Sequence, residues 1–454
     1  MKLLLLPIYC LWSLLLAAQW TPGDHYREYV WTTPASGEDF LRVGGRYGYA
    51  SNPNALPDSL QRGDQLLLPY DLDLAGASRA EVVIERVQSH EDSRNLRISI
   101  NGHASIRIPE PASIPAPATE YMFHANLTVP IPLEQLQVGS DNYFQLTLDS
   151  TQRWNWPQNI IYGLTFRIYY DAAEKDFLLP PSTGPYGQVS IASPKPETST
   201  ANATERSSWG QLYYPHREVP PQSYLQVDIP AGMDLDLMLA AFDLDFNGRG
   251  DYHHHWQTYR GEPHHQLGSI SLEEPLAYSD TTTWVTHYLP WSTAWLPDQT
   301  EPMQIHARVK DHEGIYHALP PLKGLELAAR PFRVELILPQ EQPANWVTRS
   351  GEFSQQLEIE DLSGLLDYQL SWTSWSPCYA NGLYLNEHLI WIREGDCYVY
   401  ATHQLEFSGA DLDYLQTGTN LLKTGKTPLF DGQMVHGMEV QWPGIQFKAR
   451  FDNQ

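Results

Sequence analysis

The chain has 454 residues, with 29 Lys and Arg against 54 Asp and Glu and a formal net charge of −25 at pH 7. This length suits two to four domains, since a single core rarely grows beyond about 250–300 residues. The acidic excess argues against a nucleic-acid-binding protein, which needs a basic stripe, and disfavours docking on an anionic membrane.

The amino-terminal segment predicts export. Lys2 is followed by an apolar run over residues 3–18 that ends in small residues, which is typical of a cleaved secretory signal. We therefore expect residues 1–20 to be a signal peptide and residues 21–59 to form an irregular extension. No later run reaches the roughly 20 apolar residues that a membrane-spanning helix requires. The mature protein is expected to be secreted, periplasmic or at the cell surface, without a membrane span.

Short segments in which apolar and polar residues alternate dominate the rest of the chain. Such alternation, rich in β-branched and aromatic residues and closed by Gly, Asn, Asp or Pro, indicates β-strands. Amphipathic helices are nearly absent, so we expect an all-β protein built of sandwiches. The alternating segments include residues 80–87, 96–100, 144–148, 164–169 and 303–309.

A change in composition divides the chain. Residues 177–222 are rich in Pro, Ser and Thr, which is typical of a linker that buries little apolar surface. A shorter break bounded by proline follows at residues 339–343. These breaks leave three predicted modules, at residues 60–176, 223–339 and 345–454.

The two outer modules share a motif of two leucines, a glycine and an asparagine. In both, a strand and a turn that contains Asn101 or Asn386 come before it. We interpret the motif as a corner, in which the leucines pin a short turn on the core and Gly followed by Asn turns the chain into the next strand. The motif residues are Leu133, Leu136, Gly139 and Asn142 in the first module and Leu412, Leu415, Gly418 and Asn420 in the last.

This order of strand, Asn turn, corner and closing strand resembles the galactose-binding-like jelly-roll modules of secreted bacterial proteins. The resemblance covers residues 60–176 and 345–454, and the middle module is similar to an immunoglobulin- or fibronectin-like sandwich. It implies tandem β-sandwiches, with two jelly-roll-like modules flanking one Ig-like sandwich. Modules of this kind commonly accompany carbohydrate-active enzymes or serve as adhesive binding arrays.

One acidic loop has the composition of a calcium site. Hard Ca²⁺ prefers oxygen ligands at alternate positions of a tight loop with a glycine at the reversal. The twelfth position is His254 rather than the Glu of an EF-hand, and an Asp- and Asn-rich turn without metal explains the pattern equally well. The candidate ligands are Asp243, Asp245, Asn247 and Asp251.

A group of histidines follows this loop. On a strand, His253 and His255 share one face, and with His264 or His265 they would offer three imidazoles to Zn²⁺ or Cu²⁺. A solvated His-rich loop remains the alternative.

Tryptophans near turn-forming residues are the candidate ligand-binding side chains. Trp154, Trp156 and Trp375 have polar neighbours, and rigid aromatic rings at loop ends suit stacking on the apolar faces of sugars. Burial in a sandwich core is the alternative for such rings.

Two cysteines remain after removal of the signal, Cys378 and Cys397. In an oxidising compartment they predict a single disulfide, with two inert thiols as the alternative.

These features favour an exported, non-catalytic binding protein whose partner is a carbohydrate or an extracellular protein. A metal-dependent enzyme acting on a polysaccharide or glycoprotein through residues 243–265 stays open, as does a structural spacer in a cell-surface assembly. No nucleophile elbow, phosphate loop or dinucleotide fingerprint is present to name a reaction.

Overall fold

The fold is known from a computed structural model, which describes most of the chain between residues 23 and 453. The described residues are 23–33, 40–43, 49–51, 56–89, 95–109, 122–148, 159–177, 187–192, 217–219, 221–240, 266–270, 284–298, 302–340, 348, 352–392, 400–426 and 438–453.

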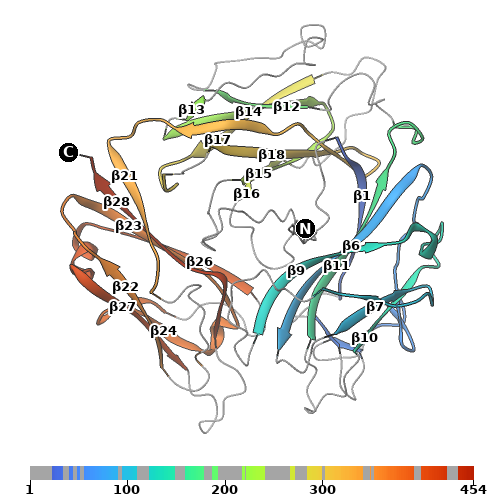
Figure 1. Cartoon of the computed structure of the whole chain (residues 1–454), viewed down its shortest axis with the longest axis horizontal. Coiled ribbons are helices and arrows are strands. Elements are labelled where there is room, and N and C mark those ends of the chain that lie inside the picture. Colours follow the sequence, from blue (N-terminus) through green and yellow to red (C-terminus); the bar gives the residue numbers. More distant parts are fainter. Residues whose placement is uncertain are drawn as a thin grey trace, which may run out of the picture.

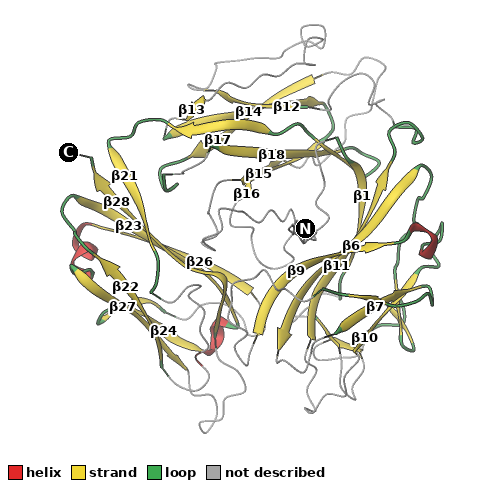
Figure 2. Cartoon of the chain, viewed as in Figure 1, coloured by secondary structure: helices red, strands yellow, loops and turns green. Residues whose placement is uncertain are grey.

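Strands make up nearly all of the regular structure in these residues, which confirms the all-β prediction (Figure 2). The named helical elements of this part of the chain are three short 3₁₀ turns, η3 (Leu133–Gln135), η7 (Pro377–Tyr379) and η8 (Gly409–Tyr414). No helix among the described residues is long and apolar enough to cross a membrane.

The amino-terminal unit consists of two layers of sheet that enclose one apolar core. The core contains Val82 and Ile84 from one layer and Ile98 and Phe144 from the other. The first layer contains β1 (His25–Trp31), β2 (Leu41–Val43), β3 (Tyr49–Ser51), β6 (Ala77–Ser89), β9 (Met122–Ile131) and β11 (Asn159–Tyr170). The second contains β4 (Gln61–Arg62), β5 (Gln65–Leu67), β7 (Leu96–Ile100), β8 (Ile106–Arg107) and β10 (Tyr143–Leu148).

The middle unit repeats this two-layer plan around a second core, which includes Leu225, Leu235 and Ile305. Its β12 lies within residues 177–222, where a linker was expected. One layer contains β13 (Arg217–Val219), β15 (Asp234–Ala240), β16 (Gln266–Ile270), β18 (Met303–Lys310), β19 (Ile315–Ala318) and β20 (Leu322–Leu327). The other contains β12 (Gln188–Ala192), β14 (Gln222–Pro230) and β17 (Trp284–Ser292).

The carboxy-terminal unit has two four-stranded sheets around a third core, which includes Leu370, Leu422 and Phe447. Its β21 lies before the break at residues 339–343 yet pairs with the last strand, β28. One sheet contains β21 (Phe332–Ile337), β23 (Leu365–Trp375), β26 (Tyr400–Ser408) and β28 (Glu439–Asp452). The other contains β22 (Phe353–Ile359), β24 (Ala380–Leu385), β25 (His388–Trp391) and β27 (Gly418–Lys426).

Strand β1 joins the first two units into one twelve-stranded sheet. It pairs with β11 along its whole length, while its first three residues also pair with β19 on the other side. The expectation of separate sandwiches in tandem is therefore wrong for these units, because β1 is a strand of both. The expectation that residues 21–59 are irregular is wrong at β1, which is a regular strand. Tyr29 and Trp31 of this strand point into the apolar core and alternate with Glu28 and Val30, as the two faces of a sheet require.

The units surround a common centre in a propeller-like arrangement (Figure 1). In the amino-terminal unit, β7 and β10 lie on the outside, and β6 and β11 lie on the side of the centre. The face of β6 and β11 that is turned away from the apolar core is therefore the face toward the centre.

The predicted corner motif is confirmed in both outer units. Asn142 Oδ1 accepts hydrogen bonds from Asn101 Nδ2 (2.8 Å) and the Gln137 amide (2.9 Å). Asn420 Oδ1 accepts the equivalent bonds from Asn386 Nδ2 (3.0 Å) and the Gln416 amide (2.9 Å). In each corner the asparagine of the turn has a positive φ, 48° at Asn101 and 52° at Asn386. Two distant parts of the chain thus build the same corner from the same side chains.

Candidate functional site

The site residues named from the sequence lie largely outside the described residues. This holds for the calcium candidates Asp243, Asp245, Asn247 and Asp251, for the histidines His253, His255, His264 and His265, and for Trp154 and Trp156. Trp375 is the last residue of β23, and its side chain is not described. Within the described residues, no group of three or more His, Cys, Asp and Glu side chains is placed to hold a metal ion.

Of the two cysteines of the predicted disulfide, the structure describes Cys378. Cys378 lies in η7 and is disulfide-bonded, while Cys397 lies outside the described residues. The pairing of Cys378 with Cys397 therefore stays a prediction.

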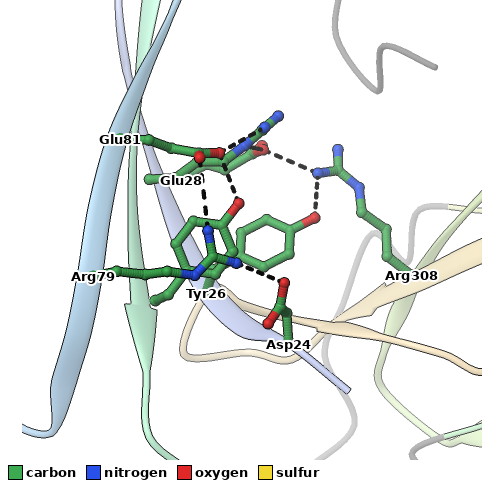
Figure 3. A network of polar contacts seen from close by, with 8 residues as sticks. Asp24, Tyr26, Glu28, Arg79, Glu81 and Arg308 are labelled. Carbon is green, nitrogen blue, oxygen red and sulfur yellow. Dashed lines mark hydrogen bonds and ion pairs between the residues drawn. The ribbon is translucent and has the colours of Figure 1, made fainter. Parts of the chain in front are cut away.

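The structure brings together a buried charged cluster that was not expected (Figure 3). Glu28 of β1 accepts hydrogen bonds at Oε1 from Arg167 Nε of β11 (2.7 Å) and from Arg308 Nη1 of β18 (3.0 Å). Arg308 Nη1 also donates to the Tyr26 hydroxyl (3.0 Å). The cluster therefore crosses from the amino-terminal unit to the middle unit.

A second carboxylate joins this cluster from β6. Glu81 Oε1 accepts hydrogen bonds from the Tyr169 hydroxyl (2.7 Å) and from Arg167 Nη1 (3.3 Å). Arg167 therefore bridges Glu28 and Glu81. Glu28, Arg167 and Glu81 are register partners across β1, β11 and β6, and residues opposite one another on paired strands point to the same side of the sheet. This face is opposite to the apolar core.

Burial and neighbouring charges shift the pKa values of Glu28 and Glu81 in opposite directions. Burial alone would raise the pKa of Glu28, but the Arg308 and Arg167 guanidinium groups lower it below its usual range. For Glu81, burial raises the pKa above its usual range and outweighs the effect of Arg167 and Tyr169. The side chains are 2% and 1% exposed, so both charges depend on their partners rather than on water.

A chain of hydrogen bonds crosses the junction of β1 and β19 next to this cluster. Asp311 Oδ2 is 3.0 Å from His317 Nε2, and His317 Nδ1 is 2.9 Å from His25 Nδ1. When neutral His317 donates from Nε2 to Asp311, its Nδ1 accepts from His25, which fixes the tautomers of both rings. Burial and the neighbouring His317 lower the pKa of His25 to about 4.

A cavity of about 560 Å³ opens where β1 separates from the β18–β19 hairpin. Lys310 Nζ forms an ion pair of 3.2 Å with Asp234 at its wall. The Tyr316 ring stacks on Tyr26 with ring centroids 5.4 Å apart, so the cavity wall contacts the charged cluster directly. The charged and aromatic residues that line it include Arg27, Glu28, Asp234, Lys310, Asp311 and Tyr316.

The charges around this cavity nearly cancel. Its wall carries the carboxylates of Glu28, Asp234 and Asp311 and the cations of Arg27 and Lys310. Arg308 and Arg167, which do not line the cavity, form ion pairs with Glu28. A strongly charged ligand would meet groups of both signs. The composition suits an uncharged ligand that both donates and accepts hydrogen bonds.

The sequence contains a signal for this cluster. Glu81 and Glu85 hold polar positions of the alternation in β6, Arg167 and Arg308 hold such positions in β11 and β18, and all four lie inside their strands rather than at the ends. Charged residues inside strands that are otherwise apolar indicate pairing, because an unpaired charge is costly to bury. Which carboxylate meets which guanidinium depends on the pairing of β1 with both β11 and β19.

Comparison with known proteins gives no family for this chain. No protein-family model matches it, and no curated protein matches it. Solved structures that are similar in part include the enzyme BuGH86 in complex with neoagarooctaose, with a TM-score of 0.21, 8% identity and coverage of 52% of this chain and 33% of that one. This chain thus spans about a third of that enzyme.

Two other structures are matched over nearly their whole length. Peptide:N-glycanase F has a TM-score of 0.17 and 8% identity, with 94% of this chain and 96% of that chain covered. The extracellular domain of ANXUR2 from Arabidopsis thaliana has a TM-score of 0.17 and 8% identity, with coverage of 94% and 97%. These TM-scores are too low to carry an argument about fold or function.

Proposed function

We propose that this protein is an exported binding protein that takes an uncharged carbohydrate into the cavity between β1 and the β18–β19 hairpin. The observation that carries the proposal is the cavity itself, whose volume of about 560 Å³ falls within the usual range for small-ligand sites. Its wall combines acidic oxygens, cationic nitrogens and an aromatic ring, and its charges nearly cancel.

Sugar hydroxyls match this wall because each hydroxyl both donates and accepts a hydrogen bond. Asp234 and Lys310 form an ion pair at the rim and are 29% and 35% exposed, so a ligand reaches both. The buried cluster behind Glu28 holds the wall in place before the ligand arrives, which lowers the entropic cost of binding.

The finer assignment of the fold belongs to the same proposal. We assign the two outer units to a jelly-roll-like design and the middle unit to an Ig-like design, in a protein of secreted bacterial type. Support comes from the matching corners at Asn142 and Asn420. Two distant units that share one fold are expected to share such a corner. The proposed calcium and transition-metal sites at residues 243–265 are testable by elemental analysis of untagged protein.

A glycan array followed by calorimetry tests the binding. The double variant Asp234→Asn with Lys310→Gln removes the charges at the rim and is expected to weaken binding of the selected glycan at least about tenfold, which equals a loss of about 1.4 kcal/mol. The matched control is Arg333→Gln with Glu335→Gln, which removes a similarly exposed ion pair of 2.6 Å outside the cavity. Equal affinity of the two double variants would contradict the proposal, and an array without any binding glycan would favour the structural spacer.

A second function, a carbohydrate-processing enzyme, is favoured by one observation. The pKa of Glu28 is lowered and that of Glu81 is raised, and carboxylates with opposite shifts are the arrangement that acid–base catalysis uses. Release of products from a panel of polysaccharides and glycoproteins, with and without Ca²⁺, Zn²⁺ or Cu²⁺, would support this function. Intact substrates after prolonged incubation would leave binding as the function.

A further inference from the structure

One Asn-Gly pair lies in a β-bulge of the carboxy-terminal unit. The sequence contains three such pairs, of which the structure describes two. The register between β24 and β27 shifts after Ala380, so that Asn381 and Gly382 together lie opposite Gly425. Asn381 is exposed, although Gly382 next to it is buried. The sheet therefore holds the pair while the asparagine side chain faces solvent.

The residue after Asn381 has to be a glycine. Gly382 has a φ of 119°, which side chains disfavour, and a Cβ at this position would come 2.9 Å from both Leu389 Cδ1 and Trp391 O. Because Gly382 carries no side chain, none shields its backbone nitrogen from the Asn381 side-chain amide. The bulge therefore places an accessible backbone nitrogen next to an exposed amide.

The Asn381 amide is held by one hydrogen bond. Its Oδ1 accepts from the Gly425 backbone N–H at 2.9 Å, and among the described residues no hydrogen bond holds its Nδ2. The amide packs on Gly425, where an added Cβ would come 3.2 Å from Asn381 Nδ2. An N–H donor at a carbonyl oxygen stabilises the negative charge that develops there during nucleophilic attack. The Asn381 carbonyl is thus activated, and its nitrogen is free to leave.

The pair Asn101 and Gly102 provides a comparison within the same protein. Asn101 Nδ2 donates to Gln135 O (2.9 Å) and to Asn142 Oδ1 (2.8 Å), and Asn101 Oδ1 accepts from the Tyr143 amide (2.9 Å). Loss of this Nδ2 as ammonia would break two hydrogen bonds of the corner. The same dipeptide is therefore more strongly restrained in the amino-terminal unit than in the carboxy-terminal unit.

We propose that Asn381 is a modification site, at which spontaneous deamidation yields aspartate and isoaspartate. The Gly382 backbone nitrogen loses its proton to a solvent base and attacks Asn381 Cγ. The new C–N bond closes a succinimide ring, and the Cγ–Nδ2 bond breaks as the nitrogen takes up a proton and leaves as ammonia. Water then adds to either carbonyl of the ring and opens it. Water is the only co-reactant, and the step does not depend on the cavity proposed for carbohydrate.

The two products affect β24 differently. Aspartate keeps an acceptor for the Gly425 amide and adds one negative charge at the surface. Isoaspartate carries an additional methylene in the main chain, and the close contacts of Gly382 with Leu389 and Trp391 leave little room for it. Accumulation of isoaspartate is therefore expected to lower the stability of the sheet that contains β24.

Ageing of the unmodified protein tests the inference without any variant. The protein is kept at pH 8 and 37 °C, digested at acidic pH so that no asparagine converts during digestion, and analysed by peptide mass spectrometry. Asn381 is expected to convert at least about tenfold faster than Asn101, because two further hydrogen bonds have to open at Asn101. In concentrated urea, where these bonds are lost, the two rates are expected to converge. Equal rates in the folded protein, or an unconverted Asn381 while the unfolded chain converts, would overturn the proposal.

The variant Asn381→Gln connects the reaction to its effect on stability. Glutamine would have to close a larger ring, which forms much more slowly, so the aged variant is expected to keep its free energy of unfolding. The aged unmodified protein is expected to develop a less stable fraction, while conversion at Asn101 proceeds equally in both proteins. An equal loss of stability in both would overturn the effect assigned to isoaspartate. Should the variant fail to fold, the ratio of the two rates in the unmodified protein still decides the proposal.

Discussion

Glu28 accepts a hydrogen bond of 3.0 Å from Arg308, which lies 280 residues further along the chain. The bond connects the first strand of the amino-terminal unit to β18 of the middle unit, and both side chains are almost fully buried, at 2% and 1% exposure. Each charge in this pair is therefore compensated by the other unit.

The first prediction concerns this pair. Arg308→Met leaves the Glu28 carboxylate in a buried site with one guanidinium fewer, and breaking a buried pair typically costs about 3–5 kcal/mol. Chemical denaturation should show a fall of this size in the free energy of unfolding. Arg333→Met, which breaks the exposed pair with Glu335, should cost less than about 1 kcal/mol. A similar cost for both variants would show that Glu28 and Arg308 do not stabilise the junction.

A second prediction follows from three buried histidines, His25, His306 and His403. Burial lowers the pKa of each to about 4, with a further contribution from His317 at His25 and from Lys323 at His306. Between the unfolded pKa of about 6.5 and the folded value, the unfolded chain binds more protons than the folded one. Stability should therefore be fully present above about pH 6.5 and should fall progressively as the pH drops toward 4.

Urea denaturation at half-unit steps between pH 4 and pH 7.5 measures this loss. His25→Gln retains an amide donor for His317 but no longer titrates, so its stability should depend less steeply on pH over the same interval. An unchanged pH dependence would mean that His25 titrates normally in the folded protein.

The third prediction concerns the two corners. Asn142 and Asn420 each accept two hydrogen bonds at Oδ1 and donate two from Nδ2 to backbone carbonyls. Because a hydrogen bond contributes about 0.5–1.5 kcal/mol net, Asn142→Ala and Asn420→Ala should each cost about 2–4 kcal/mol. Asn381→Ala, which removes the one bond that the Gly425 amide donates to an exposed side chain of β24, should cost about 1 kcal/mol. Thermal and urea denaturation should show a larger loss of stability for each of the two corner variants than for Asn381→Ala.

The fourth prediction concerns the cysteines. Peptide mapping without reduction should recover a fragment in which Cys378 is linked to Cys397, and reduction should release the two peptides. Cys397→Ser should lower the free energy of unfolding by roughly 2–4 kcal/mol, the usual contribution of a disulfide. Recovery of Cys397 as a free thiol in the oxidised protein would refute this pairing.

The sequence allowed local structure to be predicted better than the assembly. The corners at Asn142 and Asn420 were recognisable because all their contacts, apart from the bond to the Asn turn, lie within a few residues. The strand pattern was recognisable for the same reason, since alternation at period two directly reports one buried face.

The partners of β1 and β21 could not be predicted in this way. The alternation in β1 shows that it is a strand, but not that it lies between β11 and β19. Likewise, β21 precedes the proline-bounded break in the sequence but belongs to a sheet of the carboxy-terminal unit, because it pairs with β28 at the end of the chain. The cluster of Glu28, Arg167 and Arg308 depends on the pairing of β1 with β11 and β19, so it could not be predicted without that pairing.

The position of β1 between two later strands has a consequence for biosynthesis. Residues 25–31 are made before their partners at residues 159–170 and 315–318, so one edge of β1 stays unpaired until β11 is synthesised and the other edge until β19 is synthesised. Contacts this distant in sequence slow folding and prolong the exposure of unpaired strand edges. Arg27 and Glu28 place two charges on β1 during this interval, and charged residues in a strand disfavour the aggregation of an unpaired edge.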